Sequence, residues 1–356
     1  MTELKPFLKK LLAASGLSGH EAPVRSLVED AWRPLTDTLK TSRLGSLYGL
    51  KKSTSSPHVE ACPSILLAAH IDAVGLMVSS VAGEYLRVTQ IGGLDWRVLP
   101  GQTVIIHGEE DLTGIIAAPP DHLLPNALQD KAPGLEHLLV DTGLPARRVS
   151  RLVKPGDLIS FAQPPIEMGE DYLVGHSLDD RAAVAALTYC LDLLQSRIHA
   201  WDVWAVATVQ EEETQAGART AAFELNPAMA VAIDVTFAKG ANDGNNFRTF
   251  PLGEGITIGW GANIHPAVFK LLKDLAEKYE IPYDMEPLPN SSGTDAIALQ
   301  IARAGIPTAV IGIPLRYMHT VVEMVSLKDI QRAGRLLAEL VTALTPETVK
   351  GLVWEE

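Results

Sequence analysis

The sequence predicts an α/β protein whose mostly parallel mixed sheet is sandwiched by helices and interrupted by an inserted small β-barrel. Strand and helix patterns alternate over both ends of the chain, which is typical of a parallel sheet covered on both faces. Short β-like segments separated by Gly and Pro fill the middle instead. Acidic and histidine residues follow the ends of several buried strands, and ligands of open α/β sheets bind at that edge.

Length and composition agree with this prediction. The 356 residues are too many for one minimal domain and suit a large core with an insertion. The chain is 47% hydrophobic and 21% charged, as in globular proteins. Its formal net charge of −13 disfavours a nucleic-acid partner, because such proteins usually carry a basic surface.

The sequence also predicts a cytoplasmic protein without a membrane partner. Residues 1–5 lack the apolar core of a signal peptide. No apolar run approaches the ~20 residues that a membrane-spanning helix needs. Cys62 and Cys190 lie in apolar stretches, so we expect two free thiols in a reducing compartment.

The first part of the α/β core is predicted to span residues 1–73. Apolar side chains recur with helical spacing in residues 2–14 and 21–34. The turn Ser18-Gly19-His20-Glu21 carries a capping signal into the second of these helices. Strands around Gly45 and a buried strand at residues 65–69 complete this part.

The inserted β-barrel domain is predicted to span residues 74–166. Helical periodicity is scarce there, and several short strands at close spacing indicate a small barrel or sandwich. Residues 119–131 have the composition of a loop. The β-like segments are residues 75–80, 85–90, 102–107, 113–117, 135–141 and 157–161.

Residues 167–356 are predicted to form the second part of the core, with a Gly- and Asn-rich loop at residues 239–255. The helices are expected at residues 181–195, 216–224, 265–280, 294–304 and 326–343. The strands are expected at residues 201–209, 228–235 and 308–313, with a further extended segment at residues 282–285.

Charged residues gather where these strands end. An apolar strand ends at Gln210, the run Glu211-Glu212-Glu213 follows at once, and a second apolar strand ends at Asp234. His70 and Asp72 follow the strand at residues 65–69, His319 follows residues 307–314, and Asp179 with Asp180 opens a helix. We therefore expect these side chains to converge at one edge of the sheet.

Such a set of side chains can hold a pair of divalent metal ions that share a water molecule. Each ion takes oxygen or imidazole ligands, one carboxylate bridges the two, and a free carboxylate acts as general base. Each residue alone has a simpler interpretation, such as a structural histidine, a solvated acidic face or a helix cap. Their common position at the ends of strands or helices favours the metal site.

The ordered motifs of the chain resemble a known family. These motifs are S-G-x-E near the start, then A-H-I-D-A-V-G-L-M-V, S-L-D-D-R, V-A-T-V-Q-E-E, A-I-D-V-T, G-T-D-A and R-Y-M-H-T. In this order, over nearly the whole chain, they resemble the metalloaminopeptidases that assemble into tetrahedral dodecamers. This is the glutamyl aminopeptidase and endoglucanase M group, in the clan of di-zinc aminopeptidases, which implies a zinc-peptidase-like fold.

The resemblance implies a role for each candidate residue. Asp179 would bridge the two ions, with His70 and Asp234 on the first and Glu212 and His319 on the second. Asp72 would orient His70, because a ligating imidazole usually donates its other N–H to an acceptor. Glu211 would be the general base for the attacking water, which requires the chain to leave strand geometry at Gln210. Zinc suits these ligands best, while cobalt and manganese remain open.

The reaction implied by the resemblance is hydrolysis of the N-terminal peptide bond of a peptide substrate. Residues 1–73 and 167–356 would then form the catalytic domain. Residues 74–166 would correspond to the dimerisation and assembly domain of the family. The resemblance therefore implies self-association as a homo-oligomer, from a dimer up to a tetrahedral dodecamer.

Three departures from the family pattern leave substrate preference open. They are Glu213 to Ala216 after Q-E-E, Ser291-Ser292 in place of two glycines, and Ala73 after His-x-Asp. The sequence disfavours two other functions. A glycoside hydrolase is disfavoured because it usually needs no metal and the chain has only 6% aromatic residues for sugar stacking. A non-catalytic relative is disfavoured because all the candidate ligands and the base are present.

Overall fold

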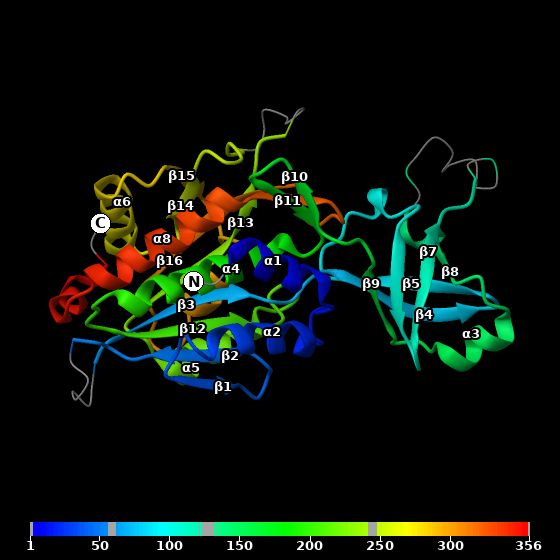
Figure 1. Ribbon diagram of the computed structural model, residues 1–356, viewed down its shortest axis with the longest axis horizontal. Coiled ribbons are helices and arrows are strands. Elements are labelled where there is room, and N and C mark those ends of the chain that lie inside the picture. Colours follow the sequence, from blue (N-terminus) through cyan, green and yellow to red (C-terminus); the bar gives the residue numbers. More distant parts are fainter. Residues whose placement is uncertain are drawn as a thin grey trace.

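The computed structural model describes all residues except 1–2, 56–61, 121, 123–131, 133, 241–247 and 355–356. A large α/β body and a smaller β-barrel lie side by side (Figure 1). The predicted loop at residues 119–131 therefore falls mostly outside the described residues. No helix in the described ranges is long and apolar enough to cross a membrane.

An eleven-stranded mixed sheet forms the centre of the large body. Its middle strands are parallel, since β12 and β13 both pair in parallel with β3, and β13 pairs in parallel with β16. The strands β14 (Ile256–Gly261) and β15 (Tyr283–Leu288) branch from the main path, because β14 pairs with both β16 and β15. The order along the main path is β1 (Thr38–Thr41), β2 (Leu47–Lys51), β12 (Asp202–Thr208), β3 (Ser64–His70), β13 (Met229–Phe237), β16 (Thr308–Arg316), β17 (Glu323–Ser326), β11 (Tyr172–Gly175) and β10 (Ile166–Met168).

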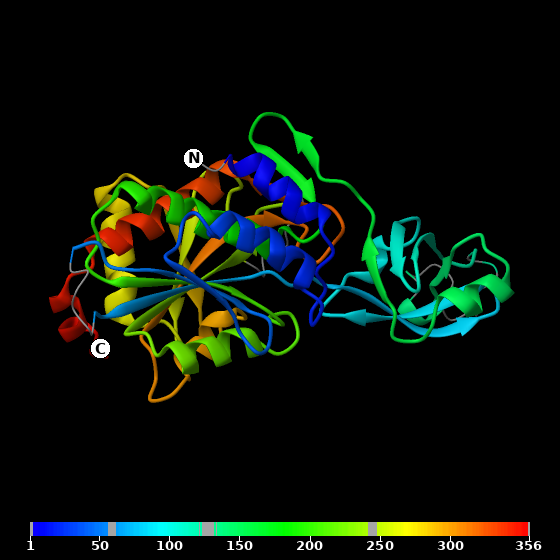
Figure 2. The same cartoon turned by 60° about the horizontal axis from the view of Figure 1, so that its bottom comes forward.

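Helices cover both faces of this sheet (Figure 2). On one face, α1 (Leu4–Ala13), α2 (Ala22–Trp32), α4 (Leu178–Leu193), α6 (Pro266–Lys278) and α8 (Leu327–Ala343) pack together. On the other face lie α5 (Ala216–Leu225) and α7 (Asp295–Gln300). Four 3-10 turns complete the described helices: η1 (Trp96–Val98), η4 (Leu135–His137), η5 (Leu194–Ser196) and η6 (Pro346–Gly351).

The helix α4 is buried around nearly its whole circumference. Its residues Ala182–Leu187 are fully buried, between the sheet on one side and α1 and α8 on the other. The close approach of α8 depends on Gly334, because a Cβ there would lie 2.5 Å from the backbone oxygen of Ala186. A glycine at this position thus lets two long helices pack backbone to backbone.

The smaller body is a closed antiparallel barrel with its own apolar core. Side chains such as Leu76, Val104 and Ile159 alternate inward along the strands and are fully buried. The barrel order is β4 (Gly75–Ala82), β5 (Tyr85–Ile91), β8 (Leu139–Asp141), β7 (Asp111–Ala117), β6 (Thr103–His107) and β9 (Leu158–Phe161), with helix α3 (Ala146–Leu152) between β8 and β9. The predicted fold class, a helix-covered mixed sheet with a small β-barrel, is confirmed.

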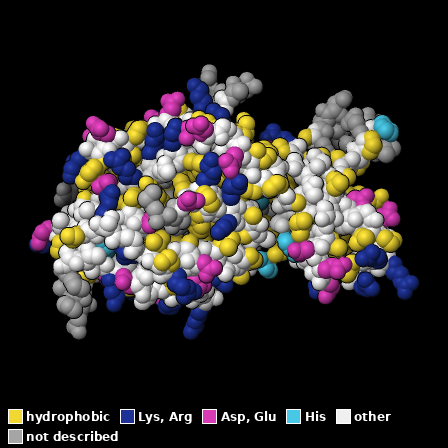
Figure 3. All heavy atoms as spheres, in the orientation of Figure 1, with side chains coloured by type: hydrophobic (Ala, Val, Ile, Leu, Met, Phe, Trp, Pro, Cys, Tyr) yellow, Lys and Arg dark blue, Asp and Glu magenta, His cyan; other side chains and the backbone are white. Residues whose placement is uncertain are grey.

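The barrel lies in the chain between two strands of the large sheet. Residues 71–74 join β3 directly to β4, and residues 162–165 join β9 to β10. In the space-filling view the molecule narrows where the two bodies meet, and positive and negative side chains are interspersed over the large body (Figure 3). The exact domain boundaries, 73/74 and 166/167, stay a prediction.

Several elements differ from the expected ones. The predicted helix at residues 294–304 ends at Gln300, and residues 135–141 begin as a 3-10 turn before β8. Helix α4 is assigned from Leu178, but Asp179 and Asp180 have non-helical backbone angles, so the regular helix begins at Arg181 as expected. The sequence analysis did not predict the helix α3 or the strands β10, β11, β14 and β17.

Candidate metal centre

The predicted site residues come from four neighbouring parallel strands and one helix. His70 is the last residue of β3, and Asp234 lies in the second half of β13. Glu211 and Glu212 follow β12, and His319 follows β16. Asp179 stands at the start of α4, where its peptide bond to Asp180 is cis. Parallel strands bring these ends to one edge of the sheet, as expected.

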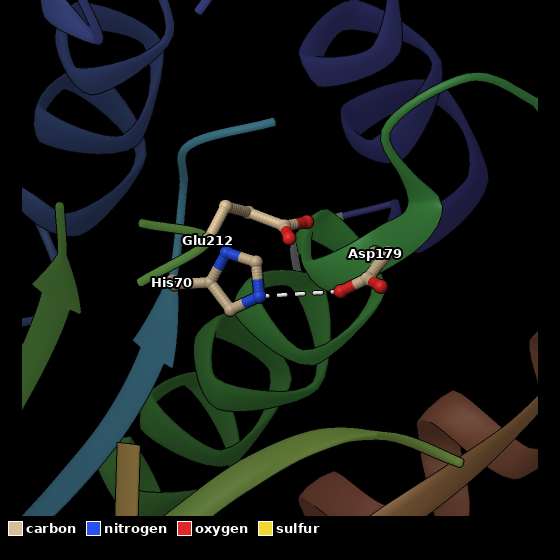
Figure 4. A group of neighbouring side chains, drawn as sticks. All are labelled: His70, Asp179 and Glu212. Atoms are coloured by element: carbon tan, nitrogen blue, oxygen red, sulfur yellow. Dashed lines mark hydrogen bonds and ion pairs between the residues drawn. The ribbon is translucent and has the colours of Figure 1, made fainter. Parts of the chain in front are cut away.

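Asp179 lies between the two histidines. Its Oδ1 is 3.2 Å from Nε2 of His70, and its Oδ2 is 3.3 Å from Nε2 of His319 (the first contact is drawn in Figure 4). Glu212 Oε2 lies 3.6 Å from Nε2 of His319. Asp234 Oδ1 lies 4.0 Å from Nε2 of His70. A carboxylate that presents one oxygen to each of two imidazoles has the arrangement of a bridging metal ligand.

Glu211 approaches the same centre without standing between the histidines. Its Oε2 is 3.9 Å from Nε2 of His70, and its Oε1 accepts a hydrogen bond from the Gln215 side-chain amide at 3.1 Å. All five predicted ligands and Glu211 line one pocket of about 430 Å³. The structure therefore brings the predicted ligands and the predicted base together.

A sharp turn lets two consecutive glutamates reach this pocket. Gln210 has a φ of 59°, so the chain leaves extended geometry there, as the sequence analysis required. The buried carboxylate of Asp72 holds the turn, accepting the backbone N–H of Glu211 at 3.0 Å and that of Glu212 at 3.2 Å. It also accepts the Ser18 hydroxyl at 2.6 Å.

Asp72 also contacts the far side of the His70 ring. The distance from its Oδ1 to Nδ1 of His70 is 3.4 Å, and its backbone oxygen is 3.2 Å from the same nitrogen. The carboxylate does not line the pocket. Asp72 therefore contacts both the His70 ring and the glutamate turn, and its role in orienting His70 stays a prediction.

The carboxylates of the cluster are buried close together and repel one another when charged. Burial, followed by the nearby Asp179 charge, raises the pKa of Glu212 well above its usual value. Burial also raises the pKa of Asp234 well above its usual value, and Glu211 adds repulsion. Burial would raise the pKa of Asp179 too, but His319 and His70 outweigh it and lower that pKa. A divalent cation would relieve this repulsion.

The residues present fit bound metal ions. Among the described residues, Glu212 Oε1 and Asp180 Oδ1 are buried without a hydrogen-bond partner, although buried carboxylate oxygens normally have one. Two groups have ligand atoms that all lie within 4.8 Å of one another: His70 with Asp179 and Glu212, and His70 with Asp180 and Asp234. Imidazole and carboxylate donors suit zinc, and also cobalt or manganese.

Asp180 and Arg181 have distinct places beside the cluster. Oδ2 of Asp180 accepts the backbone N–H of His70 at 3.3 Å, and burial, then Asp234, raises its pKa well above the usual value. Arg181 instead points away, donating from Nη1 to the backbone oxygens of Leu11 and Ala14 at 2.5 Å and 2.7 Å. It fastens the end of α1 to the start of α4.

Sequence reasoning missed three residues that support the centre. Glu323 is buried and accepts the backbone N–H groups of His319, at 2.9 Å, and Asp179, at 3.2 Å. Gln215 donates to Glu211 and also to the backbone oxygen of Thr294 at 2.8 Å. Burial, followed by the Glu211 charge, raises the pKa of Asp295 to about 8. For Glu323, the sequence signal that could have identified it is an acidic residue within an otherwise apolar segment.

One loop of the barrel contacts two segments of the centre. The backbone N–H of Gly92 donates to Oε1 of Glu213 at 2.7 Å, so Glu213 faces away from the pocket and ties the barrel to the glutamate turn. The backbone N–H of Asp95 donates to the His319 oxygen at 3.2 Å. A Cβ on Gly93 would lie 3.2 Å from Nδ1 of His319, which shows how closely this loop approaches.

Comparisons with known proteins agree with this site. The profile of the M42 glutamyl aminopeptidases matches residues 45–336. The lysyl aminopeptidase of Pyrococcus furiosus is 34% identical over 346 residues, which is 95% of this chain and 97% of that protein.

Solved structures agree in fold over the whole chain. A TET aminopeptidase from a marine sediment Thaumarchaeota archaeon is 30% identical with a TM-score of 0.91, covering 99% of this chain and 100% of that one. The TET1 peptidase of Pyrococcus horikoshii, described as assembling into a tetrahedron or a large octahedral shell, is 28% identical with a TM-score of 0.81, covering 96% and 100%. The chain therefore belongs to the M42 glutamyl aminopeptidase family, and it is a metallo-aminopeptidase.

Proposed function

We propose that this protein removes N-terminal residues from peptides with two divalent metal ions and Glu211 as general base. The observation that carries the proposal is the Asp179 carboxylate, whose two oxygens face one histidine each within one pocket. His70 and Asp234 would hold the first ion with Asp179. Glu212 and His319 would hold the second with the same carboxylate. Zinc is the proposed ion, with cobalt and manganese as alternatives.

When bound, the ions would polarise the scissile carbonyl, hold the free amine of the substrate and lower the pKa of the attacking water. Glu211 takes the proton from that water and hands it to the leaving amine. Burial raises the pKa of Glu211, which makes it a better proton carrier near neutral pH. Gln215 holds one Glu211 oxygen in place, so the other oxygen faces the reaction centre.

The proposal extends to the division of the chain and to its assembly. Residues 1–73 and 167–356 would form the catalytic domain, and residues 74–166 the assembly domain of a cytoplasmic homo-oligomer. Support comes from the related TET peptidase that forms a tetrahedron or an octahedral shell. Tyr85, Trp96 and Ile115 also leave apolar surface exposed on the smaller body.

A panel of aminoacyl nitroanilides with zinc, cobalt or manganese tests the proposed reaction. We expect release of nitroaniline that a chelator abolishes and added metal restores. Glu211→Gln should lower kcat by about 100-fold or more, the usual scale for loss of general base catalysis, while metal content stays at the wild-type level. The matched control is Glu213→Gln, which removes the adjacent charge outside the pocket, keeps an oxygen acceptor for the Gly92 N–H and should keep turnover near wild type.

Two results would overturn the proposal. One is a folded protein that releases no residue from any substrate with any of the three metals. The other is a Glu211→Gln variant with wild-type turnover, which would leave the metal site standing but remove Glu211 from the base role.

A further inference from the structure

The pocket contains one carboxylate that the proposed mechanism does not use. Outside the metal centre, its described lining is neutral except for Glu286, and it includes no Lys or Arg side chain. The neutral lining residues are Gln215, Val235, Thr236, Phe237, Ser292, Gly293, Thr294 and Met318. The pocket therefore offers a substrate side chain a negative charge and no side-chain cation.

Glu286 is held in place by two hydroxyl groups. Its Oε1 accepts the Thr236 hydroxyl and its Oε2 accepts the Thr257 hydroxyl, each at 2.6 Å. No ion pair joins it to a Lys, Arg or His within the residues that the structure describes. A half-buried carboxylate that is fixed but not neutralised is suited to receive a cationic group from a ligand.

The position of Glu286 suits a long substrate side chain. Thr236 follows the metal-ligand candidate Asp234 by two residues on β13, so both point to the same side of the sheet, about 7 Å apart along the strand. Glu286 lies just beyond Thr236. Lysine and arginine have the longest cationic side chains, so they are the residues best suited to extend from the metal centre toward this carboxylate.

Gly312 makes room for this arrangement. It stands beside Asp234 and Thr257 in the neighbouring strands. A Cβ at position 312 would lie 2.2 Å from the Thr257 hydroxyl and 3.1 Å from Oε2 of Glu286. The absence of a side chain there therefore allows the hydroxyl and the carboxylate to meet at the pocket wall.

We propose that Glu286 determines specificity and selects substrates with a basic N-terminal residue, lysine or arginine. The inference rests on the proposed aminopeptidase function and adds the substrate class. An N-terminal glutamate would instead place its carboxylate near Glu286, with no Lys or Arg side chain in the pocket lining to pair with it. The chain is therefore expected to differ in preference from the glutamyl activity in its family's name.

Nitroanilides of lysine, arginine, norleucine and glutamate test the preference. Norleucine has nearly the length of lysine without the charge. The wild type should show a kcat/KM for lysine at least about tenfold above that for norleucine, and lowest for glutamate. Glu286→Gln keeps the size and removes the charge, and it should lower the lysine-to-norleucine ratio about tenfold. The matched control Asp284→Asn, which removes an exposed carboxylate from the same strand outside the pocket, should keep the wild-type ratio.

Calorimetric titration with free L-lysine and L-norleucine gives a readout that does not depend on turnover. Wild type should bind lysine about tenfold more tightly, and Glu286→Gln should lose that difference. A wild type that cleaves the norleucine or glutamate nitroanilide better than the lysine one, and binds lysine no more tightly than norleucine, overturns the inference while the aminopeptidase function stands. Preferential lysine binding without cleavage of any nitroanilide overturns the function and supports the cationic subsite. If Glu286→Gln does not fold, the wild-type preference alone decides.

Discussion

Asp72 acts on both sides of the metal centre although it does not line the pocket. One oxygen lies near the His70 ring and accepts the Glu211 N–H, while the other accepts the Glu212 N–H and the Ser18 hydroxyl. The carboxylate thus joins β3, the glutamate turn and the loop after α1. Because a buried acceptor with four contacts cannot be replaced by a donor, the position is sensitive even to an isosteric change.

Asp72→Asn is expected to lower kcat/KM by about 10–100-fold and to weaken metal binding, as is usual when the partner of a ligating histidine is lost. The new amide N–H₂ would face backbone donors, so the turn and the imidazole lose their fixed orientation. Steady-state kinetics and metal titration check this expectation. Asp30→Asn, on the exposed side of α2, is the control. Wild-type metal affinity in Asp72→Asn would contradict the positioning role.

Site residues near the ends of strands could be predicted from the sequence, because the carboxyl ends of parallel strands lie at one edge of the sheet. His70 ends an apolar strand, Glu211 and His319 each follow one, and Asp234 lies in the second half of one. The pocket brings these residues together. Glu323, Gln215 and Glu286 could not be found in this way. Each acts through a partner that is brought near by the turn or the fold, as Glu286 is brought to Thr236 by the pairing of β14 with β15 and β16.

At the scale of elements, α4 and α8 form the closest helix pair of the core. Gly334 allows this contact, since a Cβ there would be 2.5 Å from the Ala186 oxygen and 3.0 Å from the Tyr189 ring. The atom that blocks it is backbone, so relief by a small side-chain rotation is not available. Packing therefore outweighs the low helix propensity of glycine at this position.

Gly334→Ala is expected to destabilise the protein by about 1–3 kcal/mol, the usual scale of overpacking. Helix propensity alone would predict a gain of about 1 kcal/mol, so the sign of the change separates the two effects. Chemical denaturation of both proteins at equal metal concentration measures it. Gln331→Ala, on the exposed side of α8, should stay within about 0.5 kcal/mol of wild type. A stabilised Gly334→Ala variant would show that the helices can separate freely.

The long elements were predictable and the short edge elements were not. Helices such as α8 and buried strands such as β3 have strong apolar periodicity. By contrast, β10 is three exposed residues, and β11 and β17 have four residues each. Such strands are defined by the neighbour with which they pair, which single-sequence patterns do not contain. The seven-residue α3 has no capping side chain to mark its start.

At the scale of the whole molecule, the barrel branches from the strand that carries His70. Only residues 71–74 separate the end of β3 from β4, and Asp72 lies within that link. The insertion could be inferred from the sequence because β-like segments interrupt the α/β rhythm. The order of the strands within the barrel and its contact with the glutamate turn could not, since both depend on pairings between distant segments.

Light scattering coupled to size-exclusion chromatography tests the proposed assembly. The chain has a mass of 38.3 kDa, and we expect a species of at least two copies, up to a dodecamer. Dilution should shift the population toward smaller species if the contacts are weak, because assembly follows mass action. A peak at the mass of one chain at every concentration tested would rule out the homo-oligomer.

Through the loop Gly92–Asp95 the barrel, proposed to serve in assembly, also contacts the metal centre. The loop contacts Glu213 and the backbone of His319, so a segment that supports the edge of the metal centre is encoded more than 100 residues before those residues and belongs to the inserted unit. Sequence drift in that unit cannot be neutral for chemistry. A lineage that remodels the insertion must preserve the contacts of this loop with Glu213 and His319 or lose turnover. A barrel exchanged between homologues should support turnover only when its loop fits the glutamate turn of the recipient.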